Sequence, residues 1–138
     1  MGLVVFTAAI GLVWRAGSSR VSAAPSSDRV PARFIDQSVS LTLLQVSAPL
    51  CSYCGAMRGI LGDIASRESR ATHLEFDVSE VAELIERFGI RQTPTTLLVA
   101  ASGDVLARLS GPTPQAVVRT EVETALDELE RRSDEYLI

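Results

Sequence analysis

The sequence lacks lysine and asparagine, and it has a single histidine and only two cysteines among its 138 residues. Two cysteines are too few for the multiply cross-linked scaffold of small secreted domains, which needs four or more. The formal net charge is −4 and the pI is near 5.0, and this acidic balance argues against a nucleic-acid partner. Hydrophobic residues make up 46% of the chain, enough to bury the core of one domain.

The two ends of the chain differ in charge. Residues 1–33 carry four arginines against one aspartate, whereas residues 34–138 carry nine arginines against sixteen acids. The basic end also holds the most apolar run, residues 2–14. As a helix this run spans about 20 Å, which is shorter than the roughly 30 Å hydrocarbon core of a bilayer. A signal peptide, a buried core helix and a membrane anchor are the three alternatives.

We favour a single-pass membrane anchor whose first residues are missing because the start codon is assigned too late. A signal peptide carries positive charge before its apolar run, whereas Arg15 and Arg20 follow this one. Trp14 beside Arg15 suits a membrane–water interface. The arginines that follow the run place the domain on the cytoplasmic side of the membrane. If the true start lies upstream, positive charge ahead of the run could reverse this orientation and place the domain on the extracytoplasmic side. The expected organisation is an anchor at 1–16, a flexible linker at 17–33, a folded domain at 34–132 and a tail at 133–138.

Hydrophobic periodicity in the folded domain predicts an α/β fold with the element order β-α-β-α-β-β-α. The expected elements are strands at 39–46, 73–78, 95–100 and 105–109, and helices at 52–66, 80–88 and 114–129. Residues 33–35 are a further strand candidate. A helical crossover makes the first two strands parallel, and the turn at Ser102-Gly103 makes the last two a hairpin. The result is a central mixed sheet flanked by helices, preceded by a short apolar N-terminal helix.

The candidate reactive residues are Cys51-Ser52-Tyr53-Cys54, between the first strand and its helix. Cys51 would lie at the helix N-terminus, where the helix dipole favours its thiolate, and Cys54 would be shielded and resolve a mixed disulfide. Two other interpretations remain. Half of a zinc site needs two more ligands, and His73 is the only histidine. An inert disulfide gains little stability from so small a loop.

A second motif, Gly89-Ile90-Arg91-Gln92-Thr93-Pro94-Thr95, places a proline directly before a strand, about 40 residues after the cysteines. With both motifs, residues 38–130 resemble the thioredoxin family. The resemblance implies a cis Pro94 beside the dithiol, a Thr93 backbone that pairs with an extended substrate, and a groove glycine at Gly111. Pro94 as a plain strand-start residue is the alternative.

The resemblance also implies an activity: thiol–disulfide oxidoreductase on protein disulfides, with catalytic Cys51 and Cys54, no metal and no bound cofactor. Its partners would be a disulfide-bearing protein and a separate thiol electron donor or acceptor, and the domain would be monomeric. Leu50 stands where the family has tryptophan, and Ser52-Tyr53 where it has Gly-Pro, so the direction of electron flow is open. Leu50 and Tyr53 would enlarge an apolar contact surface. This surface also suits the alternative function, a peptide-binding or scaffold module with little redox turnover.

The last expectation concerns proton handling behind the dithiol. Thioredoxins commonly place a buried carboxylate six residues before the first cysteine, and often a lysine on the adjacent strand; those positions here are Gln45 and His73. Glutamine cannot take up a proton at neutral pH, whereas histidine titrates near pH 6.5. His73 therefore either supplies the missing base or faces outward with Glu75 and Asp77 as a solvated residue without a role.

Overall fold

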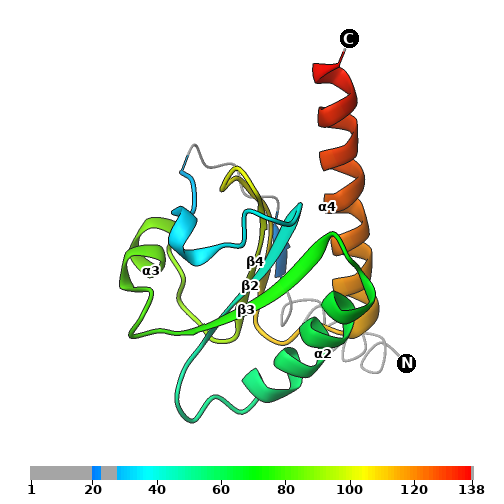
Figure 1. Cartoon of the computed structure of the whole chain (residues 1–138). Helices are drawn as coiled ribbons and strands as arrows, with labels where there is room; N and C mark the ends of the chain where they lie inside the picture. Colours follow the sequence, from blue (N-terminus) through cyan, green and yellow to red (C-terminus); the bar gives the residue numbers. More distant parts are fainter. Residues whose placement is uncertain (1–19, 23–27, 138) are drawn as a thin grey trace, which may run out of the picture.

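The structure, a computed structural model, describes residues 20–22 and 28–137 (Figure 1). Its centre is a five-stranded mixed sheet in the order β1-β5-β4-β2-β3. The strands are β1 (Arg20–Ser22), β2 (Leu41–Ser47), β3 (Ala71–Asp77), β4 (Thr95–Ala100) and β5 (Val105–Ser110). The helices are the 3₁₀ helix η1 (Ala32–Phe34), α2 (Cys54–Arg67), α3 (Ala82–Phe88) and α4 (Gln115–Tyr136).

Strand β2 lies between β3 and β4, and all seven of its residues are buried. Its apolar sequence accounts for this position, because a strand covered on both faces cannot alternate with polar residues. It pairs in parallel with β3 and antiparallel with β4, and β4 pairs antiparallel with β5. The predicted parallel first pair and the predicted hairpin are therefore both confirmed.

The two faces of the sheet carry separate hydrophobic clusters. Helices α2 and α4 cover one face, and α3 and η1 cover the other (Figure 1). Alternation along β2 supplies both clusters: Leu41 and Leu43 contribute to the first, Leu44 and Val46 to the second. Gln45 follows the alternation of the first pair and so lies on the face that carries α2.

The folded domain begins earlier in the chain than expected. Residues 33–35 do not form a strand, because Ala32–Phe34 are a 3₁₀ helix. Within the segment expected to be a linker, β1 pairs antiparallel with β5, and Val30 is buried. Val30 donates its N–H to the carbonyl of Gly103, whose φ is +93° and where a Cβ would lie 2.7 Å from the Val30 oxygen. A glycine at this turn lets the N-terminal segment cross the β4–β5 hairpin closely.

The C-terminal helix also extends past its expected end. Helix α4 continues to Tyr136, so most of the predicted tail is helical, and its last turns project beyond the sheet (Figure 1). The predicted N-terminal apolar helix falls in residues 1–16, outside the described part of the chain. Among residues 20–22 and 28–137, no helix combines the length and apolarity needed to cross a bilayer.

Candidate functional site

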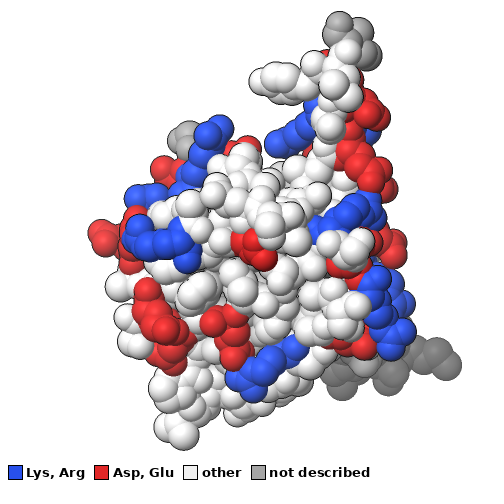
Figure 2. Space-filling view, viewed as in Figure 1, with Lys and Arg blue, Asp and Glu red and all other residues white. Residues whose placement is uncertain are grey.

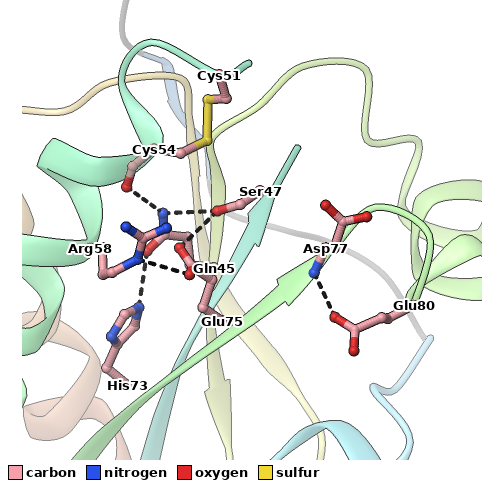
Figure 3. Close-up of polar contacts among 9 residues, drawn as sticks. All are labelled: Gln45, Ser47, Cys51, Cys54, Arg58, His73, Glu75, Asp77 and Glu80. Atoms are coloured by element: carbon pink, nitrogen blue, oxygen red, sulfur yellow. Dashed lines mark hydrogen bonds and ion pairs between the residues drawn. A yellow bond between two sulfur atoms is a disulfide. The ribbon is translucent and has the colours of Figure 1, made fainter. Parts of the chain in front are cut away.

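Cys51 and Cys54 form a disulfide, with their Cα atoms 5.5 Å apart (Figure 3). Helix α2 begins at Cys54, two residues later than expected, so Cys51 lies in the turn ahead of the helix. Cys54 is only 4% exposed, whereas Cys51 is partly exposed. The expected asymmetry between an accessible first sulfur and a shielded second one is therefore present in the geometry.

Two large apolar side chains flank the disulfide on the surface. Leu50 is fully exposed, and so is more than half of Tyr53. Leu50 also has a φ of +61°, a left-handed conformation that costs a side-chain-bearing residue about 1 kcal/mol. Neither side chain contributes to the core, so these residues are available to contact another molecule.

Pro94 lies at the same end of the sheet as the disulfide. The Thr93–Pro94 peptide bond is cis, as the resemblance to the thioredoxin family implied. The next residue, Thr95, pairs with Val46 at the end of β2, just before the loop that carries Cys51. Gly111 donates its N–H to the carbonyl of Pro94 at 2.8 Å, and its φ of +80° is one that glycine adopts readily.

Gln45 connects the dithiol to a buried polar network (Figure 3). Its side chain is 0% exposed. The amide Nε2 donates to the backbone carbonyl of Cys54 at 2.9 Å and to Ser47 Oγ at 3.1 Å. The Oε1 atom lies 3.0 Å from Nε2 of His73. Gln45 thus joins the first turn of α2 to β3 through one carboxamide.

His73 does not face outward as a solvated residue, because its ring is half-buried against Gln45. With Nε2 against the Gln45 oxygen, the ring carries its proton on Nε2 and donates it. Burial lowers the pKa of His73, an effect that Glu75 opposes and Arg58 adds to. The carboxamide of Gln45 lies between this ring and the carbonyl of Cys54.

Three residues of the network were not predicted: Ser47, Arg58 and Glu75. Ser47 Oγ donates to Glu75 at 2.9 Å, and Arg58 Nε donates to the same carboxylate at 2.8 Å. Burial opposes ionisation of Glu75, yet the hydrogen bonds from Arg58 and Ser47 outweigh it and keep its pKa below the usual value. The alternation of β3 placed Glu75 beside His73 on one face, but only the strand register brings it to Ser47.

The zinc interpretation finds no support among the described residues. Within residues 20–22 and 28–137, no three His, Cys, Asp or Glu side chains are arranged to hold a metal ion. Both cysteine sulfurs are committed to the disulfide.

Comparison with known families agrees with the motifs and the geometry. The thioredoxin family model matches residues 28–124. The chain belongs to the thioredoxin family. The match begins ahead of the expected domain start and includes both the cysteine pair and the cis proline.

Solved thioredoxins share this fold at low sequence identity. A mutant thioredoxin from Halobacterium salinarum superimposes with a TM-score of 0.58 at 21% identity, covering 64% of this chain and 77% of its own. For thioredoxin NaTrxh from Nicotiana alata the TM-score is 0.56 at 20% identity, with 62% and 73% covered. For the germline-specific thioredoxin Deadhead from Drosophila melanogaster the TM-score is 0.56 at 25% identity, with 63% and 83% covered.

Proposed function

We propose that this chain is a thiol–disulfide oxidoreductase that acts on protein disulfides through Cys51 and Cys54. The observation that carries the proposal is the disulfide itself, which joins a partly exposed sulfur ahead of α2 to a buried one at its first residue. An accessible nucleophile and a shielded resolving thiol are the two parts that disulfide exchange needs.

The reaction needs no bound cofactor, because the two thiols hold the two electrons. In the reduced protein, the Cys51 thiolate attacks one sulfur of the substrate disulfide, and the other sulfur leaves as a thiolate. Cys54, once deprotonated, attacks the Cys51 sulfur of this mixed disulfide and releases the second substrate thiolate. The substrate gains two electrons, and the protein is left with the Cys51–Cys54 disulfide. A separate dithiol donor restores the reduced form, and the reverse sequence oxidises a substrate.

The substrate segment that suits this site is uncharged and extended. No charged residue occurs in residues 47–57, 92–103 or 109–118, which include the loops that carry the cysteines, Pro94 and Gly111. At the same end of the sheet, Asp77 at the end of β3 and Glu80 in the β3–α3 loop are charged. Figure 2 shows uncharged atoms over the end of the molecule formed by the β2–α2 loop, while charges of both signs cover the flanks and α4. Leu50 and Tyr53 would contact apolar substrate side chains, and the Thr93 backbone would pair with the substrate as an added strand.

We also propose that residues 1–16 hold the protein at a membrane. Strand β1 is antiparallel to β5 and begins with Arg20 opposite Ser110. Because Ser110 directly precedes Gly111, the chain ahead of Arg20 connects to the redox end of the sheet. A membrane anchor would therefore keep the disulfide close to the membrane surface. Co-sedimentation of the full chain with lipid vesicles tests this, and a chain that lacks residues 1–16 should stay in the supernatant.

The activity is tested by reduction of insulin with dithiothreitol. The wild type should accelerate precipitation of the insulin chains, and the folded Cys51→Ser variant should not, because it lacks the attacking thiolate. If the wild-type dithiol is intact and the folded protein gives no turnover in either direction, the chain is a peptide-binding module instead.

The roles of the two cysteines are tested by trapping. Cys54→Ser should accumulate mixed disulfides with substrate proteins, because the resolving thiol is missing, and Cys51→Ser should accumulate none. In the reduced wild type, Cys51 should alkylate at pH 7 at least tenfold faster than Cys54, since only Cys51 is accessible. Equal trapping by both variants would contradict the assignment.

A further inference from the structure

One buried hydroxyl near the dithiol has no hydrogen-bond partner among the described residues. The Oγ1 atom of Thr96 is inaccessible to solvent and bonds to no other polar atom in that part of the chain, and the residue is 0% exposed. An unpaired buried hydroxyl costs about 1–3 kcal/mol, so such groups are rare in folded proteins. Thr96 therefore has an unused donor in the core of the molecule.

Thr96 lies next to Gln45, in the layer between the sheet and α2. The two residues are direct partners in the antiparallel pairing of β4 with β2. Side chains of such partners project from the same face of the sheet, about 5 Å apart at Cβ. Gln45 itself donates to the backbone carbonyl of Cys54. Thr96 is therefore separated from the resolving cysteine by one neighbour only.

The polar groups around Thr96 are already engaged. Both amide protons of Gln45 are donated, to Ser47 and to the Cys54 carbonyl, and its oxygen faces His73. The adjacent Thr95 on β4 donates its own hydroxyl to a loop carbonyl. The Cys54 sulfur is bonded to Cys51 in the oxidised protein, and reduction turns it into a new acceptor beside this layer.

We propose that the Thr96 hydroxyl donates a hydrogen bond to the Cys54 sulfur when the disulfide is reduced. The inference rests on the proposed function, because it assigns Thr96 a part in the redox cycle of the same cysteine pair. Reduction adds two electrons, breaks the S–S bond and lets the two sulfurs move apart to a non-bonded separation. The Cys54 thiolate that forms during turnover is a far stronger acceptor than a disulfide sulfur.

The hydroxyl then acts on both redox states in the same direction. In the oxidised protein its unpaired state disfavours the disulfide, and in the reduced protein its hydrogen bond stabilises the Cys54 thiol and, more strongly, the thiolate. Burial favours the protonated Cys54 thiol, and the same hydrogen bond opposes this effect because it stabilises the thiolate. Thr96 thereby makes the disulfide easier to reduce and makes the resolving step faster.

The test is the redox equilibrium of the full chain with glutathione, in which each disulfide reduced converts two glutathione thiols into one glutathione disulfide. Thr96→Val removes the hydroxyl and keeps the branched shape of the side chain. We expect its equilibrium to shift roughly tenfold toward the disulfide, which for this two-electron couple is about 30 mV. Thr96→Ser retains the hydroxyl and should stay near the wild-type equilibrium.

Thr42 offers a matched control on the neighbouring strand. It is also buried, but its hydroxyl accepts the N–H of Asp36 at 3.1 Å, away from the cysteines. Thr42→Val should destabilise the oxidised and reduced forms equally and leave the glutathione equilibrium unchanged. Release from the mixed disulfide should slow in Thr96→Val only, while alkylation of Cys51 proceeds at the wild-type rate in both variants.

Three results would overturn the inference: an unchanged equilibrium in Thr96→Val, an equal shift in Thr96→Ser, or the same shift in Thr42→Val. Should Thr96→Val fail to fold, proton NMR of the wild type decides, since the Thr96 hydroxyl proton must exchange more slowly in the reduced form than in the oxidised one. The glutathione equilibrium uses no protein substrate. Failure of the proposed function would instead appear as absent insulin reduction with this redox behaviour intact.

Discussion

The Nε2 atom of His73 lies 3.0 Å from Oε1 of Gln45, and this contact limits what the histidine can do. The same carboxamide donates to the Cys54 carbonyl from its nitrogen, so it lies between the ring and the resolving cysteine. A carboxamide does not take up a proton at neutral pH. In this arrangement His73 orients Gln45, and it is not in position to deprotonate Cys54 directly.

This geometry predicts how the resolving step responds to mutation. His73→Ala removes one neutral hydrogen bond, so release from the mixed disulfide should slow by less than about tenfold. Gln45→Asp adds a carboxyl whose pKa burial raises. Its release rate should therefore rise with pH across a range where the wild type is flat, because the carboxylate becomes a base.

Stopped-flow measurement of release between pH 5.5 and 8 checks both variants, with Cys51 alkylation as the control that should not change. A Gln45→Asp profile identical to the wild type would show that this position does not handle protons. If the release rate of His73→Ala fell by far more than tenfold, His73 would be the base that deprotonates Cys54.

His73 should also make stability depend on pH. Burial lowers its pKa in the folded protein below the unfolded value near 6.5. Between these two values the unfolded chain binds more protons than the folded one, so the free energy of unfolding falls as the pH falls through 6.5. Glu75, whose pKa is held below its usual value, stays charged in this range.

The check is denaturant unfolding of the oxidised protein at pH 7.5, 6.5 and 5.5, because disulfide-bonded cysteines do not titrate. His73→Gln retains a donor toward Gln45 and should lose this part of the pH dependence. If the free energy of unfolding changed equally with pH in the wild type and in His73→Gln, the His73 ring would be as well solvated in the folded state as in the unfolded one.

The sequence predicted those features that depend on local pattern. Apolar periodicity defined β2, α2 and the start of the closing helix to within a few residues, and the spacing of Cys51, Cys54 and Pro94 indicated the site. Contacts that depend on strand register were not predictable, because alternation gives the face of a side chain but not its partner across the sheet. Thus Glu75 was expected to be solvated, yet the register of β3 brings it to Ser47, and the packing of α2 against the sheet brings Arg58 to it.

The N-terminal boundary was misplaced for a similar reason. Residues 17–33 have no periodicity and a small, polar composition, which is typical of a linker. Strand β1 is only three residues long, too short to show alternation. Its position is determined by the free edge of β5, a property of the assembled sheet.

At position 50, a glycine variant should be more stable than an alanine variant, which is the reverse of the usual order. At its φ of +61° alanine keeps the left-handed strain and glycine does not, so Leu50→Gly should be more stable than Leu50→Ala by about 1 kcal/mol. The exposed side chain makes no core contact, so both variants lose the same apolar surface. If that surface binds substrate, kcat/KM for insulin should fall about tenfold in both, the effect of losing roughly 1.4 kcal/mol of contact.

Guanidinium unfolding and insulin reduction separate these two effects. Leu50→Met should retain the activity, because methionine restores an apolar side chain of similar size. Greater stability of the alanine variant would contradict the backbone argument, and unchanged kinetics in Leu50→Gly would exclude the contact with substrate.

The last prediction concerns what β1 contributes to the domain. A chain that begins at residue 17 keeps β1, and one that begins at residue 28 loses it and uncovers the outer edge of β5. The shorter chain should still unfold cooperatively and reduce insulin, because both hydrophobic clusters are built from residues beyond 28. Its free energy of unfolding should be lower by roughly 1–3 kcal/mol, the effect of losing two or three edge hydrogen bonds.

Guanidinium unfolding of the two chains side by side makes the comparison, with the m-value as the measure of cooperativity. Equal midpoints would show that β1 adds nothing to the stability of the sheet. A non-cooperative transition in the shorter chain would show that the residues ahead of position 28 belong to the core.

The exposed β5 edge should also make the shorter chain more prone to self-association, since an unpaired edge strand is a template for another chain. Sedimentation at increasing protein concentration would detect this, and the chain beginning at residue 17 should remain monomeric under the same conditions.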